Sequence, residues 1–370
     1  MSRMNVLGLS SYPVEEPSAR YRLKQFVSPL AERGITLIVR PFLDSKAFAM
    51  LYQRQAWPYT VVALLKSGLL RLKDLLLLSS ADVVFVQREA MLFGPPLFEW
   101  LAARVFRRPL VLDLDDATYV PYTSPTYGKL GKALKWFSKT DDLIRWADIV
   151  TCGNRAIAEY ARSKGAKTRI IPTVVNTDIF RPPSRMPHDP LVLGWIGTRT
   201  TFPYLKSVFP ALQELARTHP FRLKIVGGGE RTTNIPGVEV ENLEWTLEGE
   251  VEDFQSIDIG LYPIDPTLYP ERWAAGKSGL KGIQYMAIGI PFVATPVGAI
   301  QEIGKAGVTH LHALTNVEWQ EALKLLLFNP ELRRAMGTSG RHHVVEHYSL
   351  SEQAEKLAQA LREASARAVA

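Results

Sequence analysis

Short runs of apolar residues alternate with longer amphipathic stretches along the first half of the chain. The apolar runs have the length of buried strands and are predicted at residues 5–10, 35–39, 81–87, 109–114, 148–152 and 168–172. Apolar residues at helical spacing predict helices between them, at residues 18–33, 46–79, 96–106, 128–147 and 154–164. Strands that alternate with helices are typical of a parallel sheet covered on both faces.

The same alternation returns in the second half, after a proline-rich segment. Residues 178–190 contain four prolines in thirteen positions, a composition typical of a linker. The elements predicted beyond it are strands at 191–196, 223–226, 238–240, 257–262 and 291–295 and, most clearly, helices at 203–218 and 277–288. From about residue 316 the pattern is helical, with an interruption predicted at residues 337–340.

The two alternating halves predict an α/β protein with two Rossmann-like, doubly wound domains that face an interdomain cleft. We expect the first domain at residues 1–180, a linker at 181–190 and the second domain at 191–350. The last helix, 351–370, is expected to pack back toward the first domain. Two domains also suit a chain of 370 residues, because single cores stop growing beyond about 250–300 residues.

Charge is distributed unevenly between the halves. Residues 1–188 hold 27 lysines and arginines against 16 acids, a net charge of +11, whereas residues 189–370 hold 17 against 21, a net charge of −4. A basic half joined to a mildly acidic half indicates different partners for the two domains, although a basic surface can also serve solubility alone.

The composition predicts a cytoplasmic protein. Cys152 is the only cysteine, so no internal disulfide can form, which fits a reducing compartment. The first residues, MSRMNVLGLSSYP, lack the long apolar stretch of a signal peptide. No run of 18 or more apolar residues predicts a membrane span.

One predicted helix has the character of a membrane-surface helix. Four lysines recur in it at steps of three and four residues, beside apolar neighbours: Lys129, Lys132, Lys135, Lys139, Leu130, Leu134, Trp136 and Phe137. Such a helix can lie on an anionic membrane, and the leucine-rich stretch 61–78 with its three cations could do the same. A peripheral position on the inner face of the membrane is therefore expected for the basic domain, with a plain solvated face as the alternative. No recognition helix or aromatic-and-basic sheet motif is present, so nucleic acid is not an expected partner.

Residues 276–299 predict a phosphate-binding helix followed by a buried strand. A Gly-Lys-Ser-Gly turn opens the helix, and Gly289 and Pro291 end it. Its first N–H groups and the positive end of its dipole favour a nucleotide diphosphate. The residues expected to bind it are Lys277, Ser278, Gly279, Leu280, Lys281 and Gln284. Glu271 stands where an NTPase phosphate loop needs glycine, which disfavours that loop, and a solvated helix start is the other alternative.

Two further strand ends in the second half supply candidate phosphate-binding groups. Gly197, Thr198 and Arg199 follow the strand 191–196, and Gly227 follows the next one. Glycine permits close backbone approach, while hydroxyl and guanidinium groups donate to phosphate oxygens. A plain flexible turn is the alternative at Gly227.

A cluster of acids, Asp113, Asp115 and Asp116, lies at the end of the strand 109–114. We expect these carboxylates to line the cleft, where they can bind hydroxyls or accept a proton. The alternatives are the nucleophile of an aspartate-dependent phosphatase, a Mg²⁺ site and a cap for the next helix. Ala117 stands where the phosphatase motif needs threonine or valine, which disfavours that interpretation.

The spacing of His343, Glu346 and His347 fits one class of zinc protease. A third ligand is not apparent in the sequence, so we expect a surface helix there and no metal.

Several segments together resemble a known enzyme family. The segments in question are GIQYMAIGIPFVATPVGAIQEI (282–303), IIPTVVNTDIFRP (170–182), LVLGWIGT (191–198) and HHVVEHYSLSEQAEKL (342–357). They resemble, in order and in sequence, the family-four retaining glycosyltransferases, which have the fold of two Rossmann-like domains called GT-B. The resemblance covers most of the chain.

This resemblance implies transfer of a sugar from a nucleotide-diphosphate sugar to an acceptor hydroxyl, with retention, in cell-surface polysaccharide or glycolipid synthesis. The acceptor would be a sugar or a lipid-linked molecule, and no metal would be needed. Asp115 matches the family's catalytic-cleft histidine, with Asp116 beside it. The residues expected to be catalytic are Asp115 and Asp116, which would orient the acceptor or assist the proton transfer, and Lys277, which would act on the diphosphate.

The chain departs from the family at the paired glutamates of the donor site. These fall on Gly276 and Gln284, so Gln284 would bind the ribose while the first acid is absent. Lys277, Glu271 or Asp265 could take over part of its role. The missing acid also motivates an alternative, a non-catalytic nucleotide-sugar-binding subunit of a polysaccharide assembly.

The cations of the family are also displaced. Two of them fall on Thr198 and Pro203, so the expected replacements are Arg199, Lys277 and Lys281. In the first domain, a Gly-Gly pair of the family is replaced by Ser18 and Ala19. The loop near the diphosphate or acceptor is therefore expected to use Ser18, Arg20 and Arg22.

Overall fold

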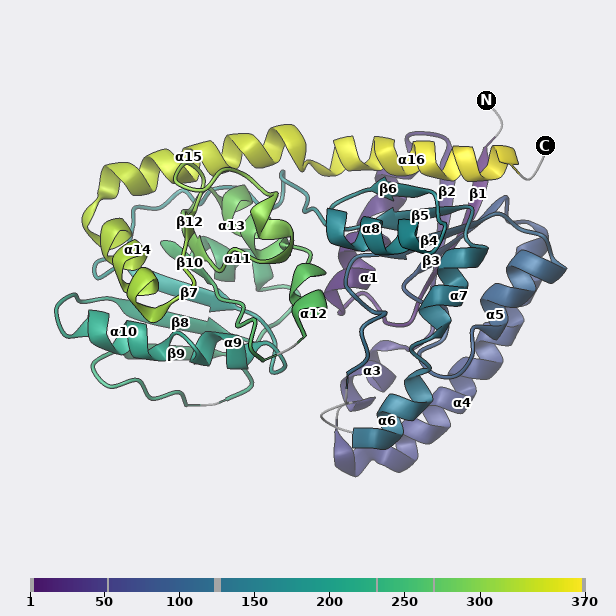
Figure 1. The fold of residues 1–370 in the computed structure, drawn as a ribbon, viewed down its shortest axis with the longest axis horizontal. Helices are drawn as coiled ribbons and strands as arrows, with labels where there is room; N and C mark the ends of the chain where they lie inside the picture. Colours follow the sequence, from purple (N-terminus) through teal and green to yellow (C-terminus); the bar gives the residue numbers. More distant parts are fainter. Residues whose placement is uncertain (1–2, 52, 123–127, 231, 269, 368–370) are drawn as a thin grey trace. The chain divides into compact units, whose positions relative to one another are not determined.

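The computed structural model describes residues 3–51, 53–122, 128–230, 232–268 and 270–367 (Figure 1). The chain forms two compact units, and each is made of more than one segment. The first consists of Met1–Thr173, Gly276–Ser278 and Leu350–Ala370, and the second of Val174–Ala275 and Gly279–Ser349. Residues 181–190, predicted as a linker, thus group with the second unit, where Arg185 forms an ion pair with Asp258.

The first unit is built on a six-stranded parallel sheet of order β2-β1-β3-β4-β5-β6. Its strands are β1 (Met4–Ser10), β2 (Ile35–Pro41), β3 (Val83–Gln87), β4 (Leu110–Leu114), β5 (Ile149–Cys152) and β6 (Thr168–Ile170). The strands β3, β4 and β5 are buried along their whole length, because helices cover both faces of a doubly wound sheet. The strand order reverses between β1 and β3, and sheets of this kind generally bind ligands at the carboxyl ends of the strands beside such a reversal.

The helices of the first unit are α1 (Pro17–Arg22), α2 (Val27–Ala31), α3 (Ser45–Leu51), α4 (Trp57–Lys73), α5 (Leu97–Trp100), α6 (Gly128–Lys135), α7 (Lys139–Trp146), α8 (Arg155–Ser163) and α16 (Leu350–Arg367). The helix α16 lies against α2 and the central strands (Figure 1). Its Glu355 and Glu363 pair with Arg33 and Lys167 of the same unit. Residues 368–370 of the predicted last helix lie outside the described residues.

The basic helix predicted at 128–147 is broken in the structure. Trp136 has a φ of 55°, in the left-handed region, and this residue separates α6 from α7. Lys135 and Lys139 then turn inward to pair with Glu89, which is 5% exposed. The expectation of four lysines on one solvent face was therefore wrong, because two of them neutralise a buried carboxylate. The long helices predicted at 18–33, 46–79 and 203–218 are also split into shorter ones.

The second unit has another six-stranded parallel sheet, of order β12-β11-β10-β7-β8-β9. Its strands are β7 (Val192–Ile196), β8 (Arg222–Val226), β9 (Glu239–Leu243), β10 (Ile259–Tyr262), β11 (Phe292–Ala294) and β12 (Leu311–His312). Its helices are α9 (Phe202–Lys206), α10 (Phe209–Ala216), α11 (Glu250–Gln255), α12 (Glu271–Ala275), α13 (Leu280–Ile288), α14 (Asn316–Phe328) and α15 (Pro330–His347). The α/β class predicted from the alternation is confirmed for both units.

The interruption predicted at residues 337–340 is absent, because α15 continues through both glycines. A Cβ on Gly337 would lie 2.1 Å from the carbonyl oxygen of Gly289, and one on Gly340 would lie 2.9 Å from Met286. The glycines therefore allow α15 to pack closely on α13 rather than ending a helix.

Candidate functional site

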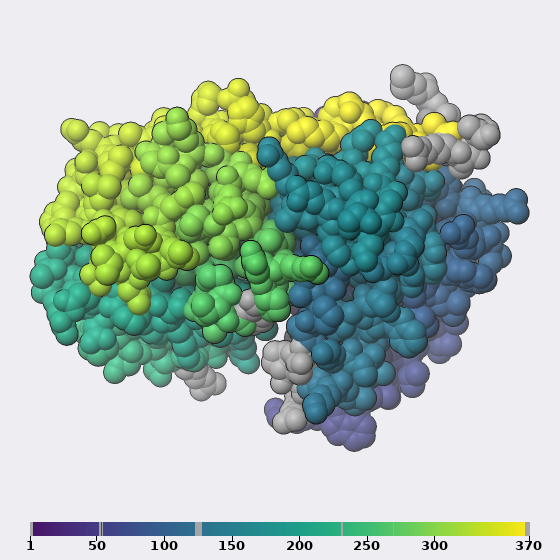
Figure 2. All heavy atoms as spheres, in the orientation of Figure 1, coloured from purple at the N-terminus to yellow at the C-terminus, as the bar shows by residue number. Residues whose placement is uncertain are grey.

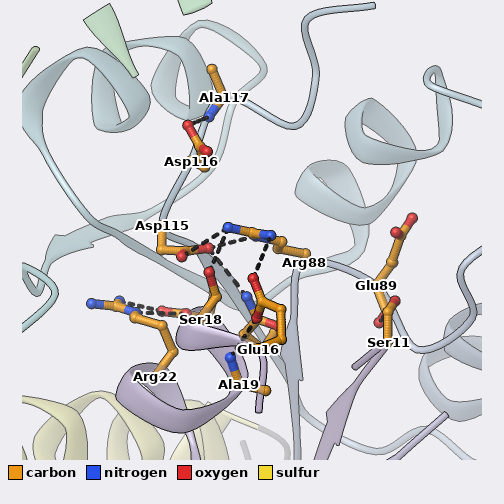
Figure 3. A network of polar contacts seen from close by, with 12 residues as sticks. Ser11, Glu16, Ser18, Ala19, Arg22, Arg88, Glu89, Asp115, Asp116 and Ala117 are labelled. Carbon is orange, nitrogen blue, oxygen red and sulfur yellow. Dashed lines mark hydrogen bonds and ion pairs between the residues drawn. The ribbon is translucent and has the colours of Figure 1, made fainter. Parts of the chain in front are cut away.

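In the first unit, charged side chains gather where β1, β3 and β4 end. These strands are neighbours in the parallel sheet, so their carboxyl ends share one edge. Figure 3 shows Arg88, which directly follows β3, between Asp115 from the end of β4 and Glu16 from the loop before α1. The three groups form one connected network.

The centre of this network is the pair of Arg88 and Asp115. The Arg88 Nε donates to Asp115 Oδ1 at 2.7 Å and Nη2 donates to Oδ2 at 3.0 Å, a bidentate arrangement. Gln87 adds a bond of 3.1 Å to Oδ1. Burial by itself would raise the pKa of Asp115, but the charge and hydrogen bonds of Arg88 hold this pKa below its usual value. Asp115 is therefore an ionised carboxylate with both oxygens occupied, and it is better suited to hold Arg88 than to accept a proton.

Glu16 and Ser18 complete the network on the other side of Arg88. The Arg88 Nη2 donates to Ser18 Oγ at 2.6 Å, and a Glu16 oxygen lies 3.6 Å from Nη1. Glu16 also caps α1 by accepting from the Ala19 N–H at 2.9 Å. Burial raises the pKa of the Glu16 carboxyl above its usual value, and Asp115 adds to the rise. Glu16 is thus held beside Arg88 in a buried setting that disfavours its charged form.

Asp113, in β4, and Arg22, in α1, form a separate buried pair. Two guanidinium nitrogens of Arg22 donate to the two oxygens of Asp113, and Thr151 donates to the same carboxylate. The third Arg22 nitrogen donates to the carbonyl of Ile171 at 2.6 Å. Both side chains are 2% exposed or less. Arg22 is thus fully engaged inside the unit, and Asp113 is neither a helix cap nor placed as a phosphatase nucleophile.

Arg20, the other arginine expected near the diphosphate, lies on α1. Its Nη1 donates to the carbonyls of Val14 and Glu15 at 3.2 and 3.4 Å. Its guanidinium also lies over the ring of Tyr21, 4.7 Å from the centroid.

The segment Gly276–Ser278 brings Lys277 to Asp116. The Lys277 Nζ lies 3.2 Å from Asp116 Oδ2, and both side chains are about one-fifth exposed, at 18% and 20%. Asn154 donates to the carbonyl of Lys277 at 3.1 Å. A Cβ on Gly276 would lie 2.4 Å from that of Ala117, so this chain has no room for the family's acid at that position. Two of the three residues predicted to be catalytic therefore form an ion pair.

In the second unit, the loops after β7 and β8 contact each other through glycines. Gly227 has a φ of 77°, and a Cβ there would lie 2.3 Å from the carbonyl oxygen of Gly197. The Arg199 side chain runs past Gly229, where a Cβ would lie 2.1 Å from Arg199 Cγ. Thr198 and Arg199 are exposed on this surface. The structure thus brings together the four predicted residues Gly197, Thr198, Arg199 and Gly227.

The predicted phosphate helix α13 begins at Leu280, after Gly279 with a φ of 69°. Lys281 Nζ donates to Gln284 Oε1 at 3.2 Å and lies 5.2 Å from the centre of the Phe254 ring. Gln284 Nε2 points to Glu250 Oε1 at 3.5 Å, and both residues are buried. The first residue of α11 therefore places a carboxylate beside Gln284.

Three charged residues of these networks were not predicted from the sequence: Arg88, Glu16 and Glu250. Arg88 had a usable signal, since a charged residue directly after a buried strand faces the ligand edge of a parallel sheet. Asp265 and Glu271 were considered in place of the missing acid, but Asp265 caps its own loop through Thr267. Glu250 had no local signal, because its role depends on the packing of α11 against α13.

No helix among the described residues is both long enough and apolar enough to cross a membrane. The same part of the chain holds no group of three or more His, Cys, Asp or Glu side chains placed to bind a metal ion. His343 accepts a hydrogen bond of 3.2 Å from the N–H of Gly304.

The architecture is shared with solved structures of sugar-transferring enzymes. The chain is similar to sucrose-phosphate synthase from Thermosynechococcus elongatus, with a TM-score of 0.68, 15% identity, and coverage of 99% of this chain and 100% of that one. It is also similar to Anabaena Alr3699/HepE in complex with UDP-glucose, with a TM-score of 0.68, 15% identity, and coverage of 97% of this chain and 99% of that one. A third similar structure is α,α-trehalose 6-phosphate synthase from Burkholderia multivorans, with a TM-score of 0.65, 14% identity and coverage of 100% of both chains. The chain therefore has the GT-B fold.

The sequence of the second unit carries a narrower match. Residues 191–329 match the family Glycosyl transferases group 1, and no curated protein matches the chain. Residues 191–329 are thus similar to the group 1 glycosyl transferases, on a chain with the GT-B fold, and this match supports glycosyl transfer as the class of function. Assignment to family four remains a prediction.

Proposed function

We propose that this protein transfers a sugar from a nucleotide-diphosphate sugar to an acceptor hydroxyl with retention at the anomeric carbon. The acceptor is a sugar or lipid-linked glycan of cell-surface polysaccharide or glycolipid synthesis, at the inner face of the membrane. The observation that carries the proposal is the group 1 domain, in which the loop after β7, the loop after β8 and α13 hold the predicted donor residues. The complexes of Alr3699/HepE with UDP and UDP-glucose, on the same fold, support this class of donor.

The second unit has groups suited to each part of such a donor. Gly197 and Gly227 let the two loops pack against each other, and beside them Thr198 and Arg199 supply a hydroxyl and a cation for the diphosphate. The N–H groups and dipole of α13, with Lys281, favour negative charge at the same end of the helix. These charges would stabilise the diphosphate as the bond to the anomeric carbon breaks.

The ribose is proposed to bind the pair of Gln284 and Glu250. A family carboxylate at position 284 is here an amide, and Glu250 restores a negative charge 3.5 Å from it. An amide and a carboxylate can together bind two vicinal hydroxyls. Glu250 of α11 thus supplies the carboxylate that position 284 lacks, and the assignment needs no metal.

In the first unit, Arg88 and Glu16 are proposed to face the acceptor, with Asp115 as the positioning residue for Arg88. The resemblance implies that the leaving phosphate takes the acceptor proton while the acceptor oxygen bonds to the anomeric carbon. Lys277, held by Asp116, is proposed to stabilise that phosphate.

A panel of nucleotide sugars tests the proposal by thermal shift, followed by assay of nucleoside diphosphate release with sugar and lipid-linked acceptors. One donor is expected to raise the melting temperature and to be consumed. If a donor raises the melting temperature but no acceptor leads to release of nucleoside diphosphate, a non-catalytic binding subunit is favoured. The observation behind this alternative is Gly276, where no acid would fit beside Ala117. Neither stabilisation nor release would overturn both functions.

A further inference from the structure

The helix α4 has its polar and apolar faces reversed relative to an ordinary surface helix. Its buried residues are polar, namely Thr60, Ser67 and Arg71. Many large apolar residues of α4 and the turn after it are exposed, with exposed fractions of 62% at Trp57, 47% at Val61, 64% at Val62, 67% at Leu65, 65% at Leu69, 52% at Leu72 and 77% at Leu76. Leu64, Leu75 and Leu77 are partly buried, and Leu78 is fully buried. A helix of a soluble unit normally turns such residues toward the core.

The buried arginine holds the helix in this orientation. Arg71 Nη1 donates to Asp74 at 2.9 Å, Nε donates to the carbonyl of Ala90 at 3.1 Å, and Nη2 donates to the carbonyls of Ser10 and Arg40 at 3.1 Å. Rotation that buried the leucines would break all of these bonds and bring the charge to the surface. The exposure of the apolar face is therefore built into the first unit.

The exposed residues form one continuous stripe. Positions 57, 61, 65, 69, 72 and 76 follow at steps of four, four, four, three and four, which keeps them on one side of a helix. At about 1.5 Å per residue the stripe is roughly 25–30 Å long. Figure 2 shows this part of the chain, in purple and blue, at the lower surface of the first unit.

The charges beside the stripe are positive. Lys66 and Lys73 are exposed, whereas the one acid of residues 57–79, Asp74, is buried between Arg71 and Arg40. Residues 57–79 all belong to the described part of the chain, and they expose no carboxylate. The same unit has a second helix of this kind, α6, where Leu130 and Leu134 are exposed beside Lys129 and Lys132.

We infer that α4, assisted by α6, docks the first unit on an anionic lipid surface, with its leucines and Trp57 entering the boundary between headgroups and acyl chains. Aliphatic residues with flanking lysines and no exposed acid match such a surface, and a basic half with a net charge of +11 is attracted to it. The proposal specifies the element by which the enzyme would reach a membrane acceptor. It rests on the proposed function only for the identity of that acceptor, because binding to lipid needs no donor.

Co-sedimentation of the purified full-length protein with vesicles tests the inference. Binding to vesicles of phosphatidylcholine with phosphatidylglycerol is expected, with weaker binding to phosphatidylcholine alone. Leu65→Gln with Leu69→Gln should lower the affinity by about tenfold or more, since two inserted side chains are lost. Lys66→Gln with Lys73→Gln should lower it about fivefold per lysine on the anionic vesicles only.

The matched control changes two exposed leucines of the second unit, Leu314→Gln with Leu325→Gln, and should bind as the unaltered protein does. Equal binding by the Leu65 and Leu69 variant would overturn the inference. Absence of vesicle binding by the unaltered protein would also overturn it. A dimer of the unaltered protein that this variant abolishes would overturn it too, because the stripe would then contact a second copy of the chain. Donor-induced thermal stabilisation should be unchanged in the variant, so the lipid proposal and the proposed function can fail separately.

Discussion

The two parallel sheets end in different ways at their carboxyl edges. In the first unit the edge is filled with charges that pair with one another, Arg88 with Asp115 and Arg22 with Asp113. In the second unit the corresponding loops contain close-packed glycines, and Thr198 and Arg199 are exposed. Paired buried charges fix the positions of their side chains, whereas glycine loops with exposed hydrogen-bond donors can bind an anion. The difference agrees with the proposal of positioning at the first edge and donor binding at the second.

The largest expected effect comes from breaking a buried pair of the first edge. Arg22→Met leaves Asp113 as an uncompensated buried charge and should lower the free energy of unfolding by about 3–5 kcal/mol. Denaturant unfolding measures the change. Arg199→Met, at an exposed arginine of the second edge, should change it by no more than about 0.5 kcal/mol. Equal losses in both variants would contradict the contrast between the edges.

Removal of a predicted diphosphate cation should act on catalysis instead. Lys277→Ala is expected to raise the barrier by about 2–4 kcal/mol, or to lower kcat/KM about 10²–10³-fold, because the leaving phosphate loses a charge-assisted contact. Initial rates of nucleoside diphosphate release measure it. Lys305→Ala, at an exposed lysine of the second unit, is the control. Full turnover in the Lys277 variant would remove this residue from the site.

Low pH is expected to destabilise the second unit before the first. All seven histidines lie between residues 188 and 347, in the second unit, and burial lowers the pKa of His310 to about 4, with His312 adding to the effect. A depressed histidine pKa means that the unfolded chain binds the proton first, so stability is complete above about pH 6.5 and falls as the pH drops toward 4. The loss should be on the order of 3 kcal/mol.

Hydrogen exchange at several pH values locates this loss. Exchange should rise first in the second unit, while the Arg88–Asp115 pair, in which the pKa of Asp115 is lowered, persists until the pH is below the usual carboxyl range. His310→Gln should flatten the pH dependence. Earlier opening of the first unit would contradict the prediction.

The smallest effect is expected at the proposed ribose pair. Glu250→Gln weakens one charge-assisted hydrogen bond and should raise the KM for the donor about tenfold, with a smaller change in kcat. Glu252→Gln, at an exposed glutamate of the same helix, should leave the KM unchanged. If both variants have a similar KM, Glu250 does not contact the ribose, and Gln284 alone would remain as its proposed partner.

Local patterns determined most of the secondary structure but not the length of the helices. Apolar runs predicted the strands β1 to β5 within a few residues. The signal is clearest for β3, β4 and β5, because a strand buried on both faces must be apolar throughout. Long helices were predicted too long, since periodicity continues through a break such as Trp136. Gly337 and Gly340 show the reverse error, because a glycine that ends a helix and one that permits close packing look alike in a sequence.

By itself, the sequence determined the α/β class, the glycine loops at Gly197–Arg199 and Gly227, and the helix that begins at Leu280, because each depends on residues close together in the chain. Only the tertiary structure decided which charges are paired. Arg22 and Arg88 were equivalent cations until Asp113 and Asp115, about 90 and 27 residues away, engaged them. It also decided that Glu250 lies beside Gln284 and that the leucines of α4 face outward. Long-range pairing and burial set these outcomes, and neither leaves a local pattern in the chain.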